Sequence, residues 1–150
     1  MLVARDVAPS KAFELLIGKL YDEGGWGPSG PLIPTKLFVG SGKPLNVTED
    51  EITAAVKNAD VVLVGMSSSV ELAREEIAAC AAAKEYGIPY GLYADTFGSA
   101  TARGWFDPVR DDASFVFVLN EKEAGEARKV FSKAKVTASG NPTWDDFFYP

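Results

Sequence analysis

The chain of 150 residues contains no histidine and only one cysteine, Cys80. Without histidine there is no Ser-His-Asp or Cys-His nucleophile system, no imidazole acid or base, and no histidine-ligated metal. A single cysteine excludes a disulfide within this chain and a cysteine-rich zinc site. Its place in an alanine-rich stretch, residues 78–83, predicts a buried packing residue. Any proton transfer would therefore depend on carboxylates.

Basic charge and long apolar runs are also scarce. Lysine and arginine number 15 against 21 aspartates and glutamates, a net charge of −6, and the basic residues are scattered along the chain. This pattern argues against binding nucleic acid through its phosphates. No apolar run approaches the ~18 residues that span a bilayer, and residues 1–6 lack the pattern of a signal peptide. We expect a soluble, cytoplasmic protein.

Apolar runs and amphipathic stretches alternate along the whole chain, which is typical of βαβ units. The fold class predicted is α/β: a doubly wound, mainly parallel six-stranded Rossmann-like sheet with helices on both faces, forming one domain over residues 1–150. Helices are expected at residues 9–21, 48–57, 68–86 and 120–132. Strands are expected at residues 1–4, 35–39, 61–64, 89–94, 114–119 and 135–138.

Turn and capping residues separate these elements. Gly87 should end the third helix, and residues 24–34, with four glycines and three prolines, should form a loop. The aromatic residues within 141–150 should dock on their own domain or, alternatively, contact another domain or chain. Capping boxes are predicted for Thr48 with Glu51 and for Ser68 with Glu71, and Asn120 with Glu123 should cap the fourth helix.

In open α/β sheets, ligands bind outside the carboxyl ends of the strands. The run Ser67–Ser69 follows a buried strand and opens a helix, so it could hold a phosphate or a sugar carboxylate. The alternative is that Ser68 only caps the helix. Gly40–Lys43 lacks the full spacing of a phosphate loop and is interpreted as a plain turn. No G-x-G-x-x-G follows the first strand, which argues against NAD.

Carboxylates at the strand ends are the candidates for proton transfer. Asp95 is the preferred general base because partial burial at a strand end would raise its pKa, although it could instead form an Asx turn. Asp6 is the second choice. Arg103 could clamp an anionic group or, alternatively, pair with Asp107 or Asp111. The predicted site has no metal and no cofactor; its catalytic residues are Asp95 and Asp6, and its substrate-binding residues are Ser67, Ser68, Ser69, Thr96, Arg103 and Lys11.

The order of several short segments resembles that of one superfamily. These segments are residues 60–65, 67–69, 86–89, 91–94, 115–123 and 136–142, followed by Asp145. With them the chain resembles the N-terminal half of a GT-B glycosyltransferase, most similar to UDP-N-acetylglucosamine 2-epimerases and the lipid A disaccharide synthase group. The similarity covers nearly the whole chain. Gly140-Asn141-Pro142 with Asp145 is its most specific motif.

The resemblance implies the acceptor or sugar side of a hexosyl-transfer enzyme, with a sugar or lipid-linked acceptor. The nucleotide-sugar donor would bind a second Rossmann-like half, either downstream in the same protein or in a separate chain. The epimerases have an acid and threonines where this chain has Met66 and Ser67–Ser69, and a histidine and a glutamate where it has Leu92 and Ala94. We therefore carry over the pocket and not the epimerase mechanism.

Two other functions remain open at this stage. The first is a flavodoxin-type binding module, in which the serine run holds the phosphate of FMN and aromatic residues near Trp26 or Trp105 stack on its ring. The second is a non-catalytic interaction protein whose aromatic stretch, residues 144–149, forms a homodimer or binds a partner chain.

Overall fold

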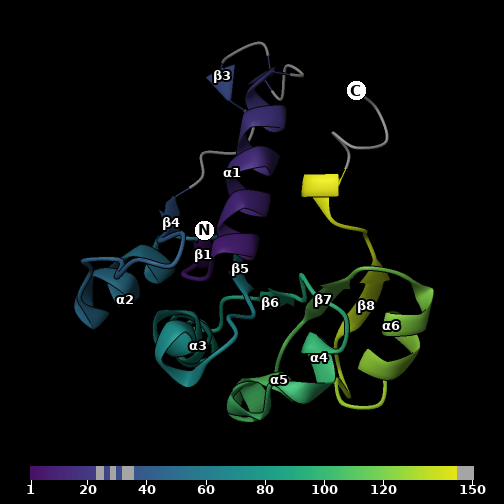
Figure 1. The fold of residues 1–150 in the computed structure, drawn as a ribbon. Helices are drawn as coiled ribbons and strands as arrows, with labels where there is room; N and C mark the ends of the chain where they lie inside the picture. The colour runs from purple at the N-terminus through teal and green to yellow at the C-terminus, as the bar shows by residue number, and fades with distance from the viewer. Residues whose placement is uncertain (23–25, 28–29, 32–35, 145–150) are drawn as a thin grey trace.

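The computed structural model describes the backbone of residues 1–22, 26–27, 30–31 and 36–144 (Figure 1). Six strands form one sheet in the order β4-β1-β5-β6-β7-β8, and every neighbouring pair in it is parallel. This confirms the predicted α/β fold with a doubly wound Rossmann-like sheet. The strands are β1 (Leu2–Ala4), β4 (Leu37–Val39), β5 (Val62–Gly65), β6 (Tyr90–Tyr93), β7 (Phe115–Val118) and β8 (Lys135–Ala138).

Helices cover both faces of the sheet, but unequally (Figure 1). One face carries α1 (Val7–Asp22), against which the 3-10 turn η2 (Pro142–Trp144) packs. None of the described helices has both the length and the apolar character needed to cross a membrane. The opposite face carries α2 (Glu49–Lys57), α3 (Val70–Glu85), α6 (Glu121–Ala127) and the short elements α4 (Ser99–Ala102), η1 (Gly104–Phe106) and α5 (Asp107–Arg110).

The structure corrects several predicted boundaries. The helix predicted at 120–132 ends at Ala127, and the three short helical elements between β6 and β7 (α4, η1 and α5) were not predicted. The capping box predicted for Ser68 is wrong, because Ser69 caps α3 by accepting a hydrogen bond from the Leu72 amide. The predicted loop at 24–34 contains a short antiparallel pair, β2 (Trp26–Gly27) with β3 (Gly30–Pro31).

Other local predictions are confirmed. Thr48 and Glu51 form both halves of a capping box at the start of α2. The Asn120 side chain accepts a hydrogen bond from the Glu123 amide and caps α6. Gly87 follows α3 with φ 68°, a conformation that favours glycine after a helix end.

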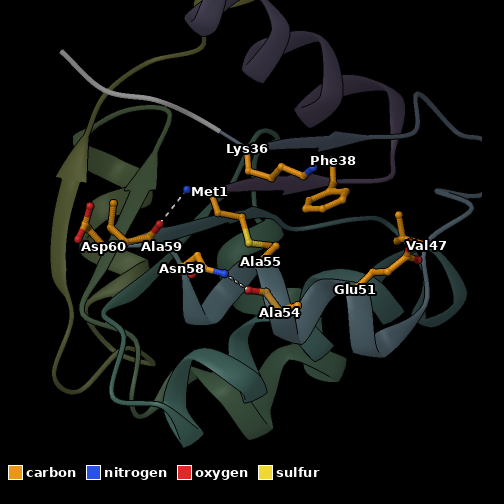
Figure 2. Close-up of a pocket in the computed structure, with 11 residues that line it drawn as sticks. Met1, Lys36, Phe38, Val47, Glu51, Ala54, Ala55, Asn58, Ala59 and Asp60 are labelled. Atoms are coloured by element: carbon orange, nitrogen blue, oxygen red, sulfur yellow. Dashed lines mark hydrogen bonds between the residues drawn. The ribbon is translucent and has the colours of Figure 1, made fainter. Parts of the chain in front are cut away.

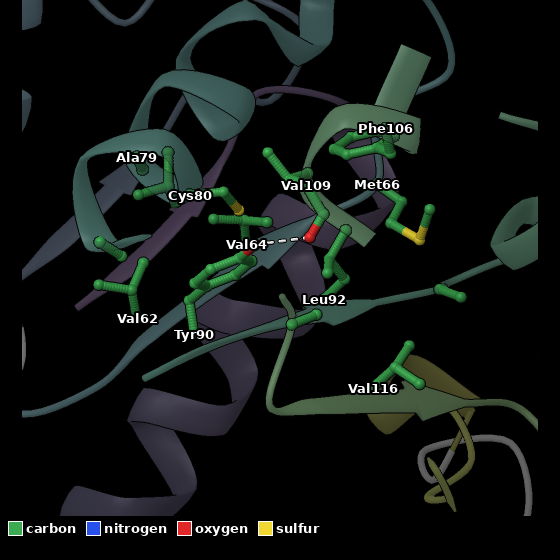
Figure 3. Close-up of a cluster of buried hydrophobic side chains, with 14 of the residues drawn as sticks. Val62, Val64, Met66, Ala79, Cys80, Tyr90, Leu92, Phe106, Val109 and Val116 are labelled. Carbon is green, nitrogen blue, oxygen red and sulfur yellow. Dashed lines mark hydrogen bonds between the residues drawn. The ribbon is translucent and has the colours of Figure 1, made fainter. Parts of the chain in front are cut away.

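The main core lies between the sheet and α3, η1 and α5 (Figure 3). Val62 and Val64 of β5 are fully buried there, as the continuous run of β-branched and aliphatic residues predicted. The Tyr90 hydroxyl donates a hydrogen bond of 2.6 Å to the Val109 carbonyl, so this polar atom is satisfied inside the core. Cys80 is also buried, which confirms its predicted packing role. A smaller cluster under α1 includes Phe13.

Candidate functional site

The carboxyl edge of the sheet brings together residues that follow β1 and β5. The chain leaves these neighbouring strands toward opposite sides of the sheet, and such switch points form the ligand crevice of doubly wound folds. The Asp6 amide donates to the Ser67 hydroxyl at 3.0 Å. The amide and hydroxyl of Ser68 both donate to Asp6 Oδ2, at 3.1 and 2.5 Å. The predicted residues Asp6, Ser67 and Ser68 therefore meet at this switch point.

The same aspartate also organises the start of α1. Asp6 Oδ1 accepts a hydrogen bond of 2.8 Å from the Val7 amide, the first residue of the helix. Burial acts to raise the pKa of Asp6, but the hydrogen bonds from Ser68 and Val7 and the Arg103 charge outweigh it, so the pKa is lowered overall. Asp6 is consequently a stable anion that joins β1 to the turn formed by Ser67–Ser69, called the serine turn below.

A buried carboxylate, Glu76 of α3, lies beneath this turn. Its side chain is fully buried. It accepts hydrogen bonds from the Ser67 amide at 2.9 Å, the Ser67 hydroxyl at 2.6 Å and the Arg5 amide at 3.2 Å. Burial raises its pKa to about 8, against the opposing effect of these hydrogen bonds, and the nearby charge of Asp6 adds to the increase. Glu76 therefore holds a proton far more readily than an ordinary glutamate.

Sequence reasoning missed Glu76, although a signal was present. Ala73, Glu76, Cys80 and Ala83 recur at spacings of three and four residues, and all four are buried. Such spacing places them on one face of a helix. An acidic residue at a position of the apolar stripe points to a buried carboxylate with specific hydrogen-bond donors, because an unpaired buried carboxylate is costly.

Asp6, Ser67 and Ser68 form one polar group at the carboxyl edge. Asp95, Thr96 and Arg103 form a second polar group at the same edge. Arg103 donates to Asp95 at 3.3 Å and to the Thr96 hydroxyl at 2.9 Å. The Asp95 side chain is 4% exposed and that of Arg103 is 14% exposed. The alternative pairing of Arg103 with Asp107 or Asp111 is therefore wrong.

The pairing differs because Arg110 takes the competing carboxylate. Arg110, three residues after Asp107, forms an ion pair with it and also donates to the Arg103 carbonyl at 3.1 Å. Trp105 donates from Nε1 to the Ser67 carbonyl at 3.1 Å. The segment after Asp95 is thus folded back toward the serine turn, and this connects the two polar groups.

The two aspartates of the site have opposite electrostatic environments. Burial raises the pKa of Asp95, the charge and hydrogen bond of Arg103 partly offset the increase, and the charge of Asp6 adds to it. The Arg103 charge also acts on Asp6. Asp95 is accordingly the carboxylate whose environment suits proton uptake.

An exposed aromatic pair flanks Asp95. The rings of Phe97 and Trp144 have centroids 6.2 Å apart and a tilt of 34°. Their side chains are 66% and 37% exposed, which is unusual for residues of this size. Asn141 links the two segments by donating to the Asp95 carbonyl at 3.4 Å. The pair therefore offers an apolar surface beside the polar groups.

Two of the predicted substrate-binding residues do not join the polar groups. Lys11 is exposed on α1, and no described contact connects it to the aspartates. Ser69 caps α3 instead. Gly40–Lys43 is a turn, as interpreted from the sequence: the Lys43 amide bonds the Gly40 carbonyl at 2.8 Å, and the Ser41 amide bonds the Ser10 hydroxyl at 3.1 Å.

A separate hollow of about 550 Å³ lies at the opposite, amino edge of the strands (Figure 2). Three of its polar side chains or termini are used within the fold. The amine of Met1 donates to the Val61 carbonyl at 2.9 Å, the Asn58 side chain donates from Nδ2 to the Ala54 carbonyl at 2.9 Å, and Glu51 belongs to the capping box of α2. The carboxyl edge is therefore the stronger candidate.

Among the described residues, no group of three or more acidic or cysteine side chains is arranged to hold a metal ion. The donor set at the carboxyl edge consists of two aspartates, hydroxyls and an arginine, and its chemistry is hydrogen bonding and proton transfer. Comparisons with protein-family models, with curated proteins and with solved structures give no match for this chain.

Proposed function

We propose that this chain is the acceptor-side domain of a GT-B-type glycosyltransferase and binds a sugar at the carboxyl edge of its sheet. The observation that carries the proposal is the pair of aspartates, Asp6 and Asp95, held at one edge with Arg103 and with their pKa values moved in opposite directions. Two carboxylates with different environments can take different roles toward one substrate.

Asp95 is the proposed general base. Its raised pKa brings proton uptake closer to neutral pH, where a base is most effective. In transfer, Asp95 would accept the proton of the acceptor hydroxyl while that oxygen attacks the anomeric carbon of the donor sugar, and the nucleoside diphosphate would leave with the electron pair of the broken bond. Arg103 and Thr96 would orient the acceptor hydroxyl beside it.

The serine turn favours a hydroxyl-rich ligand over a phosphate. Two of its amides already have acceptors, because the Ser67 amide donates to Glu76 and the Ser68 amide donates to Asp6. A bound phosphate would have to displace these carboxylates while lying close to the charge of Asp6. Sugar hydroxyls can donate to Asp6 without such displacement. The nucleotide phosphates of the donor would accordingly be held by the second domain.

The exposed aromatic pair supports a carbohydrate as the ligand. One face of a pyranose ring is lined by C–H groups and packs against an aromatic ring, while its hydroxyls bond neighbouring polar residues. Phe97 and Trp144 provide the aromatic surface, on two segments that Asn141 joins through the Asp95 carbonyl. Neither partner domain nor donor is needed to form this contact, so sugar binding can be tested with the present chain.

The test is a titration of ¹⁵N-labelled protein with N-acetylglucosamine, followed by the amide resonances. We expect shifts at Asp6, Arg103, Trp144 and residues 67–68 and 95–98, reduced by Asp95→Asn and by Phe97→Ala. Asp111→Asn, which removes a carboxylate outside the two polar groups, is the matched control and should bind normally.

Two results would contradict the proposal. Absence of shifts at the edge with sugar in large excess would remove the binding site. Turnover of a nucleotide sugar by the present chain alone would show that no second domain is required. Parallel titrations with inorganic phosphate and FMN test the flavodoxin-type alternative, which predicts shifts at residues 67–69 instead.

A further inference from the structure

The buried carboxylate beneath the serine turn is not used by the proposed proton transfer. Glu76 and Ser67 are both fully buried. Above them, Ser68 is exposed and Asp6 is partly exposed, so a sugar can reach these two residues but not the two below. Gly65, the last residue of β5, leaves room for the carboxylate, because a Cβ there would lie only 3.1 Å from Glu76 Oε1.

A chain of hydrogen bonds joins the buried pair to the residues that a ligand can reach. Glu76 Oε1 accepts from the Ser67 hydroxyl at 2.6 Å, and that hydroxyl accepts from the Asp6 amide at 3.0 Å. Glu76 Oε2 accepts from the Ser67 amide at 2.9 Å, which fixes the backbone directly before Ser68. The Ser68 hydroxyl in turn donates to Asp6. Both sides of the contact between Asp6 and Ser68 are therefore attached to the same buried carboxylate.

We propose that Glu76 is the positioning residue of this half of the sugar site, that it holds Asp6 and Ser68 in place through Ser67, and that its ionisation strengthens sugar binding there. The inference rests on the proposed sugar binding at the carboxyl edge. Ionised Glu76 accepts from all three of its donors, the Ser67 amide and hydroxyl and the Arg5 amide. When Glu76 is protonated, one of its oxygens must donate instead, and Ser67 Oγ is the neighbour that can accept. The proton of the Ser67 hydroxyl then loses its acceptor, and the turn is held less firmly.

Charge acts in the same direction as the hydrogen bonds. Burial raises the pKa of Glu76 to about 8, against its hydrogen bonds, and the charge of Asp6 adds to the increase. Ionised Glu76 reciprocally makes the electrostatic potential at Asp6 more negative. A sugar hydroxyl that donates to Asp6 places its partly positive hydrogen in this potential. The affinity for the sugar should therefore rise as Glu76 loses its proton.

The other titratable groups around α3 leave Asp6 as the charge that responds to Glu76. On α3 itself, burial and then the Glu76 charge raise the pKa of Cys80, which keeps its proton. The Arg5 guanidinium extends to Glu75 at 3.4 Å. The groups on the remaining elements packed against α3 are exposed side chains, phenols whose pKa burial raises, or an ion pair: Glu49, Asp50, Glu51 and Lys57 of α2, Tyr90 and Tyr93 of β6, and Asp107 with Arg110 of α5.

The experiment repeats the N-acetylglucosamine titration, followed at the amides of residues 67–68, from about pH 6 to about pH 9. We expect the affinity of the wild type to rise about fivefold over this range, the factor that one neutral hydrogen bond of about 1 kcal/mol contributes. Because such coupling is reciprocal, saturating sugar should lower the midpoint of the Glu76 carboxyl titration, followed by ¹³C NMR, by about 0.7 of a pH unit. Glu76→Gln should bind the sugar more weakly and lose the rise with pH.

Two further variants separate positioning from a general loss of charge or structure. Glu71→Gln removes an exposed carboxylate in the first turn of α3, outside the hydrogen-bond chain, and should keep the wild-type pH profile. Ser67→Ala keeps a titrating Glu76 but removes the hydroxyl that joins it to Asp6, so the rise with pH should be smaller than in the wild type. Circular dichroism checks that each variant is folded.

The two wild-type measurements decide the inference without any variant. An affinity that does not change with pH, or a Glu76 midpoint that bound sugar leaves unmoved, would overturn the inference while sugar binding itself stands. Failure to bind the sugar at any pH would instead overturn the proposed function, and this inference with it.

Discussion

The buried carboxylate of Glu76 makes a direct prediction about the pH dependence of stability. Its pKa is raised to about 8 from an ordinary value of 4.5, chiefly by burial. Between these values the folded protein retains a proton that the unfolded chain releases. Because the folded state then binds more protons, the free energy of unfolding falls as the pH rises. The stabilising effect of this proton is fully present below about pH 4.5 and is lost above about pH 8.

The magnitude follows from the width of this window. Each pH unit between 4.5 and about 8 changes the free energy of unfolding by up to about 1.4 kcal/mol. The total change in the free energy of unfolding across this pH range is therefore on the order of 5 kcal/mol. Glu76→Gln removes the titration and preserves the shape. Its amide carbonyl can still accept from the Ser67 hydroxyl and the Arg5 amide, but its NH₂ group faces the Ser67 amide, a mismatch of about 1–3 kcal/mol.

The assay is urea unfolding of both proteins from about pH 5 to about pH 9. We expect the wild type to be more stable at the acidic end, the difference to shrink with rising pH, and the two curves to cross. Subtracting the curves cancels groups common to both proteins, including the Met1 amine, whose pKa is lowered by burial and which acts in the opposite direction. Glu85→Gln, at an exposed position of the same helix, controls for removal of one charge. A constant difference between wild type and Glu76→Gln across this range would refute the reasoning.

Two further predictions concern stability measured by urea unfolding at neutral pH. Gly91→Ala should destabilise by at least about 2 kcal/mol, because a Cβ there would lie 2.2 Å from ring atoms of Phe115 and 2.5 Å from its carbonyl; Gly125→Ala, with nothing within 4 Å, should instead be neutral or stabilising, and equal losses for both would contradict this. Thr48→Ala should cost about 1 kcal/mol, since it removes the side chain that accepts from the Glu51 amide at the start of α2; an unchanged stability would show that the cap contributes nothing.

The sheet was predictable because its signals are local. The run of β-branched and aliphatic residues at 61–64 identified the central strand β5, and the four residues of β8 were predicted with their exact bounds. The start of α3 was missed because it depends on a choice between neighbouring residues of the same type. Ser68 and Ser69 are equally good caps by composition. The structure selects Ser69 because the Ser68 hydroxyl bonds Asp6, which lies 62 residues away in the chain.

The candidate site shows where such reasoning stops. The rule that parallel strands end at one edge placed Asp6, Asp95 and the serine run together, but it does not specify which side chains pair. Those pairings join distant segments: the Arg5 amide to Glu76 across 71 residues, and Trp105 to the Ser67 carbonyl across 38. Each pairing depends on how α3 and the segment after β6 pack against the sheet. The core side chains decide this packing. A buried carboxylate among alanines is therefore the most informative local signal in this chain, because only a site with converging donors can hold it.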